Sequence, residues 1–141
     1  MTDSITGGCL CGDVRYAAPA QPQFQSQCYC RECQYISGGH PNVIIGLSAT
    51  GLHYTKGQPS TFERPGMNLP AAREFCGRCG THILSRVPSL PDFVMVKVGT
   101  LDDPSLYTGS RINTQLADAQ PFHHVDPTVR GYHRWREAEK S

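Results

Sequence analysis

Seven cysteines in three tight clusters constrain this chain more than any other feature of its sequence. The clusters are residues 9–11 (CLC), 28–33 (CYCREC) and 76–79 (CGRC). A closed tetrahedral zinc site takes four protein ligands, whereas a catalytic zinc keeps three and leaves one position open. Seven thiols therefore divide naturally into a set of four and a set of three.

Length and charge limit the classes of protein to which the chain can belong. A chain of 141 residues suits a single domain, residues 1–141, with its own core. The net charge of +1 gives no electrostatic reason to expect nucleic acid or a membrane surface as partner. The N-terminus lacks the basic and apolar regions of a signal peptide, and no apolar run approaches the roughly 20 residues that span a bilayer. We therefore expect a cytoplasmic protein, where reduced thiols favour metal or redox chemistry over disulfides.

Short segments with strand character lie between the glycines and prolines that punctuate the chain. The β-branched run at residues 43–47 predicts a buried strand, and residues 52–54 and 61–63 predict a pair of strands around the turn at 56–59. Other segments predict strands at residues 13–17, 73–75, 82–87 and 93–98. The sequence thus predicts a mainly β fold, a small antiparallel domain with metal knuckles at its turns.

Helix is scarce in this sequence. Residues 31–37, directly after the second cysteine cluster, predict one short helical turn. Residues 128–140 predict a frayed C-terminal helix, which Gly131 weakens.

The first and third cysteine clusters predict one shared metal site. In an extended stretch, Cys9 and Cys11 point to the same side because strand side chains repeat every second residue. Cys76 and Cys79 form a C-x-x-C turn followed by glycine, which directs two sulfurs at one metal. The alternative is a redox dithiol at Cys76 and Cys79, which usually occurs in a βαβ context that this chain lacks. A structural zinc that joins the N-terminal strand to the middle of the chain is the favoured interpretation.

The second cluster has three thiols within six residues, Cys28, Cys30 and Cys33. Three thiolates bind one face of a metal and leave the opposite face to a water or a substrate. The alternative is a second structural zinc completed by a histidine. His40, His53 and His82 are the candidate fourth ligands, and spacing alone does not decide between the two interpretations.

The other histidines carry weaker expectations. The neighbours His123 and His124 would point to opposite faces of a strand, and His133 lies in a basic tail that we expect to be solvated. The sequence contains no glycine-rich phosphate loop and no G-x-S-x-G nucleophile motif.

With these residues in view, the chain resembles the glutathione-dependent formaldehyde-activating family, also called the S-hydroxymethylglutathione synthase family. Four segments carry the resemblance, in the family's order and at similar spacing, and they cover the chain from about residue 7 to 104. They are residues 8–16 (GCLCGDVRY), 28–34 (CYCRECQ) with Gly38 following, 73–81 (REFCGRCGT) and 98–104 (VGTLDDP).

The resemblance implies a small zinc-bearing β-tent fold with two zinc ions. It implies a structural zinc at Cys9, Cys11, Cys76 and Cys79, and a catalytic zinc, which we expect to be partly occupied, at Cys28, Cys30 and Cys33. The C-terminal part from Tyr107 onward matches no motif of the family, so the carbon–sulfur chemistry carries over better than glutathione itself.

Three hypotheses for function follow. The first is a zinc-dependent carbon–sulfur lyase that adds a small-molecule thiol to formaldehyde or a related aldehyde, or runs the reverse reaction, with Cys28, Cys30 and Cys33 as the catalytic residues. His40 and Tyr29 are the candidates for proton transfer because they lie near the cluster in sequence. The second is a zinc-stapled module that binds a protein partner, and the third is a reductase that uses one of these three thiols directly.

Overall fold

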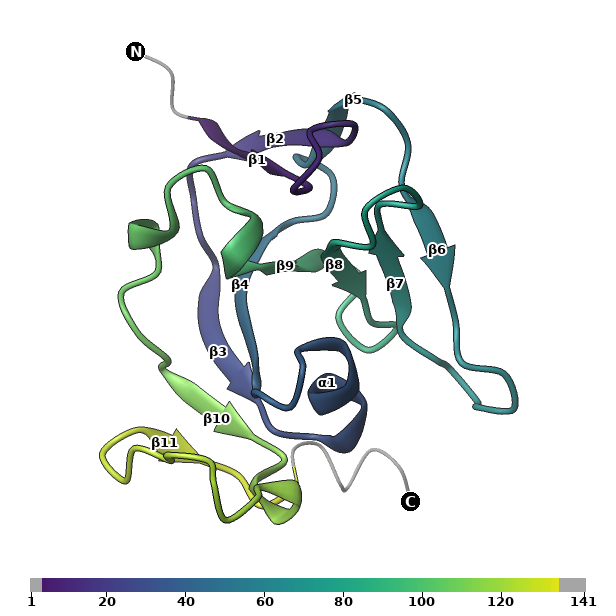
Figure 1. Cartoon of the computed structure of the whole chain (residues 1–141). Helices are drawn as coiled ribbons and strands as arrows, with labels where there is room; N and C mark the ends of the chain where they lie inside the picture. Colours follow the sequence, from purple (N-terminus) through teal and green to yellow (C-terminus); the bar gives the residue numbers. More distant parts are fainter. Residues whose placement is uncertain (1–3, 135–141) are drawn as a thin grey trace. The chain divides into compact units, whose positions relative to one another are not determined.

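The computed structural model describes residues 4–134, and the chain within it forms two compact units. The first unit comprises residues 1–24 and 45–107, and the second comprises residues 25–44 and 108–141. Two of the three boundaries fall within strands, β3 (Phe24–Cys28) and β4 (Asn42–Ser48), and the third lies between Tyr107 and Thr108 (Figure 1). Whether the whole chain acts as the single domain expected from its length stays a prediction.

The first unit contains two sheets (Figure 1). One has three antiparallel strands in the order β1-β2-β5, and in the other the order within this unit is β4-β9-β8-β7-β6. These strands are β1 (Ser4–Gly8), β2 (Arg15–Pro19), β5 (His53–Lys56), β6 (Ser60–Phe62), β7 (Ala72–Phe75), β8 (His82–Arg86) and β9 (Phe93–Lys97). Two short 3-10 helices follow, η1 (Val98–Thr100) and η2 (Pro104–Leu106).

Apolar side chains of these strands form the core of the first unit. Tyr16 is 1% exposed, and its hydroxyl bonds to the Thr100 hydroxyl at 2.9 Å, which satisfies a buried polar group. Glu74, also buried, accepts hydrogen bonds from the Tyr54 hydroxyl and from Nε of Arg86, both at 2.6 Å. The fully buried side chains are chiefly β-branched or leucine: Ile45, Leu47, Ile83, Leu84, Val94 and Val96.

The second unit is built around the end of β3 and the segment that follows it. The helix α1 (Arg31–Ile36) begins three residues after β3, and the order of strands in this unit is β11-β10-β3-β4. The strand β10 (Ile112–Thr114) pairs in parallel with both β3 and β11 (Arg130–Gly131), and the 3-10 helix η3 (Leu116–Asp118) follows β10. The register places Thr114 beside Cys28.

The structure confirms the mainly β fold and most of the predicted strands. The run at 43–47 lies within β4 and is largely buried, and the segments at 73–75, 82–87 and 93–98 correspond to β7, β8 and β9. The strand predicted at 13–17 begins two residues later, because Gly12 has a φ of 84° and the chain is still turning at Asp13. The antiparallel prediction holds for the three-stranded sheet and for β6 to β9, whereas β10 is parallel to its neighbours.

Two predictions of local structure were wrong. The strands near 52–54 and 61–63 form, but they do not pair with each other: β5 pairs with β2, where Tyr54 lies opposite the buried Tyr16, and β6 pairs with β7. The predicted C-terminal helix is absent from its described part, residues 128–134. There, Arg130 and Gly131 pair with β10 as β11, which gives backbone hydrogen bonds to a segment that glycine disfavours as helix. Residues 135–140 of that prediction lie outside the described residues.

No helix among residues 4–134 could cross a membrane, since none is long and apolar enough.

Candidate metal centres

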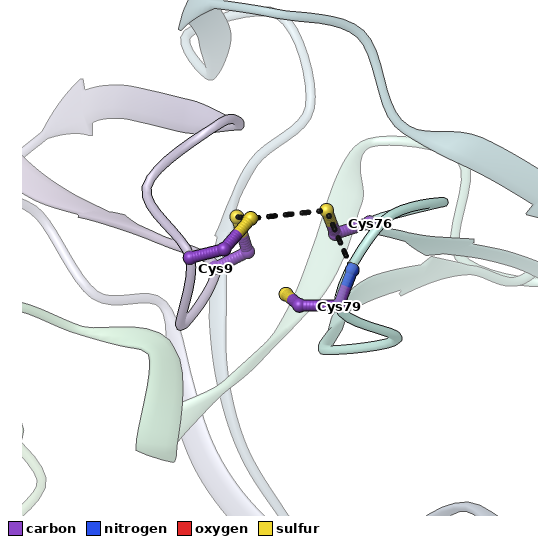
Figure 2. Close-up of side chains that lie close together, drawn as sticks. Cys9, Cys76 and Cys79 are labelled. Atoms are coloured by element: carbon purple, nitrogen blue, oxygen red, sulfur yellow. Dashed lines mark hydrogen bonds between the residues drawn. The ribbon is translucent and has the colours of Figure 1, made fainter.

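The four-cysteine cluster, Cys9, Cys11, Cys76 and Cys79, comes from two loops of the first unit. Cys9 and Cys11 lie in the turn after β1, and Cys76 and Cys79 lie in the turn between β7 and β8. Figure 2 shows Cys9, Cys76 and Cys79 directed toward one another. All four Sγ atoms lie within 4.8 Å of one another, as the sequence predicted for a shared site.

Tight turns hold these thiols in place. Cys9 and Cys11 occupy a turn closed by the Gly12 N–H to the Cys9 carbonyl at 3.1 Å, and the expected extended stretch is not formed. The second turn is closed in a similar way by the Gly80 N–H to the Cys76 carbonyl at 2.9 Å. Gly12 and Gly80 have φ values of 84° and 78°, in the left-handed region that glycine enters at little cost.

Hydrogen bonds reach several of the sulfurs, and they lower the pKa of the Cys9 and Cys79 thiols, whereas the neighbouring thiols raise the pKa of Cys11. Cys9 Sγ accepts the N–H of Val14 at 3.3 Å, and Cys76 Sγ accepts the N–H of Arg78 at 3.4 Å. A hydrogen bond with the Thr81 hydroxyl lowers the pKa of the Cys79 thiol to about 5. Donors aimed at a sulfur stabilise its negative charge and so its deprotonated form.

The distances between the sulfurs fit a tetrahedral metal site. Cys9 Sγ and Cys11 Sγ are 3.6 Å apart, and Cys11 Sγ and Cys76 Sγ are 3.8 Å apart. A tetrahedron with zinc–sulfur bonds of about 2.3 Å has edges of about 3.8 Å. The four-cysteine cluster therefore has the donor atoms and the spacing of a closed zinc site.

The three-cysteine cluster, Cys28, Cys30 and Cys33, lies in the second unit, and its sulfurs are also within 4.8 Å of one another. Cys28 ends β3, Cys30 is the N-cap residue of α1, and Cys33 lies within α1. The Cys33 N–H donates to Cys30 Sγ at 3.4 Å, so the cap of the helix is itself a thiol of the cluster. The predicted short helix at 31–37 is thus confirmed, and it brings Cys33 to the other two thiols.

Negative charge is unevenly shared within the three-cysteine cluster. Hydrogen bonds from Cys30 and then Cys33 lower the pKa of the Cys28 thiol to about 3. The same bonds raise the pKa values of Cys30 and Cys33. One thiolate is readily formed, and the next two need a positive charge to offset it. A divalent cation would supply that charge, so the donor chemistry of this cluster also fits zinc.

None of the candidate fourth ligands belongs to the three-cysteine cluster. Among residues 4–134, the group contains no histidine, aspartate or glutamate. His40 is exposed, and its Nδ1 donates to the Pro41 carbonyl at 2.8 Å. His53 is exposed on β5. His82 on β8 stacks on Phe75 with ring centroids 5.7 Å apart, and burial lowers its pKa.

A pocket of about 450 Å³ lies in the second unit and is lined by Gln27, residues 38–41 and residues 122–124. Gly38 and Gly39 line it, and a Cβ at either position would meet nothing within 4 Å. The three thiols are not among its lining residues. Gln27, which lines the pocket, and Cys28 are neighbours on β3. Because neighbouring strand residues point to opposite faces, these two side chains point away from each other.

The two proton-transfer candidates differ in their exposure. Tyr29 is 1% exposed, and its hydroxyl donates to Gln27 Oε1 at 3.1 Å, so it is a core residue. His40 is exposed and lines the pocket. Of the two, only His40 is accessible to a small molecule.

Two polar residues to which the sequence analysis gave no role organise the second unit. His123 lies in a loop, where its Nδ1 accepts the Gln120 N–H at 2.9 Å, so its Nε2 carries the proton and donates to the Gly39 carbonyl at 2.7 Å. Gln34, 3% exposed, makes hydrogen bonds to Tyr29 and Asp118. His123 and Gly39 are 84 positions apart, as are Gln34 and Asp118, which is why spacing gave no signal for these contacts. His133 is exposed, as expected.

The family model for "Glutathione-dependent formaldehyde-activating enzyme" matches residues 4–115, which contain all seven cysteines. The chain belongs to this family. The matched range includes every segment that carried the resemblance, and it ends before η3 and the loop at 120–124.

Relatives agree with the family assignment. The chain is 26% identical over 117 residues to a Halomonas elongata protein named "Putative glutathione-dependent formaldehyde-activating enzyme", covering 79% of this chain and 74% of that protein. It also matches the crystal structure of a Rhodobacter sphaeroides protein with a TM-score of 0.60 and 19% identity, over 74% of this chain and 96% of the other. This second similarity shows the fold alone.

Proposed function

We propose that this member of the formaldehyde-activating family is a zinc-dependent carbon–sulfur lyase that adds a thiol to formaldehyde or a related aldehyde, and also runs the reverse reaction. The observation that carries the proposal is the three-cysteine cluster, in which three thiols converge without a fourth histidine, cysteine or carboxylate among the described residues. Three protein ligands and one open position are typical of a catalytic zinc.

The two clusters have separate roles in this proposal. Cys9, Cys11, Cys76 and Cys79 hold a structural zinc that joins the turn after β1 to the turn after β7. Cys28, Cys30 and Cys33 hold a second zinc through three thiolates. Bound there, zinc supplies a positive centre at which a substrate thiol ionises at neutral pH or a carbonyl oxygen is polarised.

The chain's own residues prepare this centre. The Cys33 N–H donates to Cys30, and the register of β10 against β3 places Thr114 beside Cys28, so backbone structure positions both residues before a substrate arrives. Such preorganisation reduces the entropy lost when the substrate binds.

The reaction balances without an oxidant or a reductant. The sulfur of the thiol forms a bond to the aldehyde carbon, the carbon–oxygen double bond becomes a single bond, and the proton lost by the thiol ends on that oxygen. Of the two candidates for carrying this proton, we assign His40, because it is exposed whereas Tyr29 is buried in the core. The thiol is glutathione or a similar small molecule, and the cytoplasm, which keeps such thiols reduced, is the proposed compartment.

The test is the rate of hemithioacetal formation from formaldehyde and a panel of thiols, compared with the uncatalysed rate. We expect acceleration by the wild-type protein and none by Cys30→Ser, whose four-cysteine cluster is intact. Acceleration with small thiols but not with glutathione keeps the chemistry and rejects glutathione as the substrate. No acceleration with any thiol rejects the lyase and favours a zinc-stapled protein-binding module.

A further inference from the structure

Gln34 is a buried polar side chain in contact with the three-cysteine cluster's backbone. It is 3% exposed, lies on α1 one residue after Cys33, and donates from Nε2 to the Tyr29 carbonyl at 2.8 Å. That carbonyl belongs to the residue between Cys28 and Cys30. One side chain therefore joins the helix that carries Cys33 to residue 29, which lies between the other two thiols.

The same amide is anchored to the C-terminal part of the chain. Nε2 of Gln34 also donates to the Asp118 carbonyl at 2.9 Å, and its Oε1 accepts from the Arg31 guanidinium and from Nε2 of Gln120 at 3.3 Å. An amide side chain has two donor hydrogens and two acceptor lone pairs, and here all four are used. Asp118 and Gln120 lie beyond residue 115, where the match to the family model ends.

We propose that Gln34 is a positioning residue of the three-cysteine cluster: it holds Cys28, Cys30 and Cys33 at metal-binding separation and makes that separation depend on residues 118–120. The inference rests on the proposed function, because it concerns the metal that the cluster holds there. Groups that orient metal ligands without binding the metal commonly change its affinity 10- to 100-fold when they are removed.

A general role in stability is the alternative for any buried, fully bonded amide. The four-cysteine cluster separates the two roles because it lies in the other compact unit and has no hydrogen bond to Gln34 among the described contacts. A loss of global stability speeds metal release from both clusters. A loss of positioning speeds it from the three-cysteine cluster alone.

The experiment compares zinc release to a chromogenic chelator in stopped flow for wild type, Gln34→Met and the control Gln58→Met, in which the replaced glutamine is exposed. The phase that belongs to the three-cysteine cluster is the one missing from Cys30→Ser. In Gln34→Met we expect this phase to be roughly 10- to 100-fold faster than in wild type. The rate of the other phase in Gln34→Met, and the rates of both phases in Gln58→Met, should stay within about twofold of the wild-type rates. Equal acceleration of both phases, or no change in either, overturns the inference.

A milder variant covers the case in which Gln34→Met does not fold. Gln120→Ala removes one acceptor-side hydrogen bond of Gln34, and we expect release from the three-cysteine cluster to be about fivefold faster. If folded Gln120→Ala releases zinc from the three-cysteine cluster at the wild-type rate, the inference is overturned and the proposed function is unaffected. If wild type and Cys30→Ser show the same phases of zinc release, the three-cysteine cluster holds no zinc, and both the inference and the proposed function are contradicted.

Discussion

Cys11 Sγ and Cys76 Sγ lie 3.8 Å apart although 65 positions separate the two residues in the chain. This contact closes the four-cysteine cluster across two loops, and the Leu10 N–H donates to the Thr81 hydroxyl at 3.1 Å beside it. One hydrogen bond between two exposed loops stabilises them only weakly, by about 1 kcal/mol. An exposed ion pair between Arg78 and Asp13, at 3.2 Å, also joins the two loops, and exposed ion pairs add little stability. A metal held by all four thiols would therefore supply most of the free energy that joins these loops.

Replacing Cys76 by serine tests this role. Cys76 is 2% exposed and accepts two backbone N–H groups, so serine loses a metal ligand at a buried position. Structural zinc contributes roughly 10–16 kcal/mol to the folding of small zinc domains, as much as the whole stability of an ordinary domain. We expect Cys76→Ser to aggregate or to lose cooperative thermal unfolding. A Cys76→Ser protein with wild-type midpoint and metal content would show that the cluster is not structural.

The two clusters should also lose metal at different chelator concentrations. Four thiolates enclose a metal, whereas three leave a face at which a chelator attacks. We therefore expect titration with a chelator to remove metal in two steps, with the three-cysteine cluster first. Release in a single step, or from the four-cysteine cluster first, would contradict the division into four and three.

Gly7 in β1 offers a test of the packing that precedes the four-cysteine cluster. A Cβ at this position would lie closer than 3.0 Å to the Thr100 carbonyl oxygen and to the buried Tyr16 hydroxyl. Because backbone and core must shift, Gly7→Ala should lower the free energy of unfolding by about 1–3 kcal/mol. Gly99→Ala is the matched control, since a Cβ there meets nothing within 4 Å, and it should change stability by less than about 0.5 kcal/mol. Equal effects in urea denaturation would show that Gly7 is not sterically required.

Asp102 predicts a pH-dependent contribution to stability. Hydrogen bonds from the Arg15 guanidinium and from the Thr6 hydroxyl hold the pKa of Asp102 below its ordinary value of 3.8. A carboxyl group whose pKa is lower in the folded state stabilises the fold above pH 3.8, and this contribution is lost as pH falls through the folded pKa. Since both side chains are partly exposed, the contribution is at most about 1 kcal/mol.

The variant Asp102→Asn should accordingly be less stable than wild type at pH 6, and the difference should shrink below pH 3.8. Asp92→Asn replaces another exposed aspartate and provides the baseline. A difference between wild type and Asp102→Asn that is the same at pH 6 and pH 2.5 would exclude the ion pair with Arg15 as its cause.

The sequence predicted the three-cysteine cluster well because its thiols are close together in the chain. Cys28, Cys30 and Cys33 lie within six residues of sequence, so spacing alone limits how far apart their sulfurs can be. The buried strand β4 was equally visible, since its β-branched run has few alternatives to a core strand. Spacing also suggested that Cys9 and Cys11 would pair with Cys76 and Cys79, although only the fold shows the loops meeting.

Partners distant in sequence account for what spacing did not predict. β5 and β6 flank a turn that is typical of a hairpin, yet each pairs with a strand elsewhere. β11 forms because its backbone pairs with β10. The sequence of residues 130–131 by itself does not show that such a partner strand is near. Gln34 and His123 look like ordinary surface residues until the loops at 118–120 and 38–39 are placed against them.

The number of metal ions per chain, measured by native mass spectrometry on wild type and Cys30→Ser, tests the central claim most directly. The account predicts up to two zinc ions on wild type and one on Cys30→Ser, because serine at Cys30 removes a ligand of the three-cysteine cluster and leaves the four-cysteine cluster complete. Wild-type protein that never binds more than one zinc, or Cys30→Ser that still binds two, would contradict it.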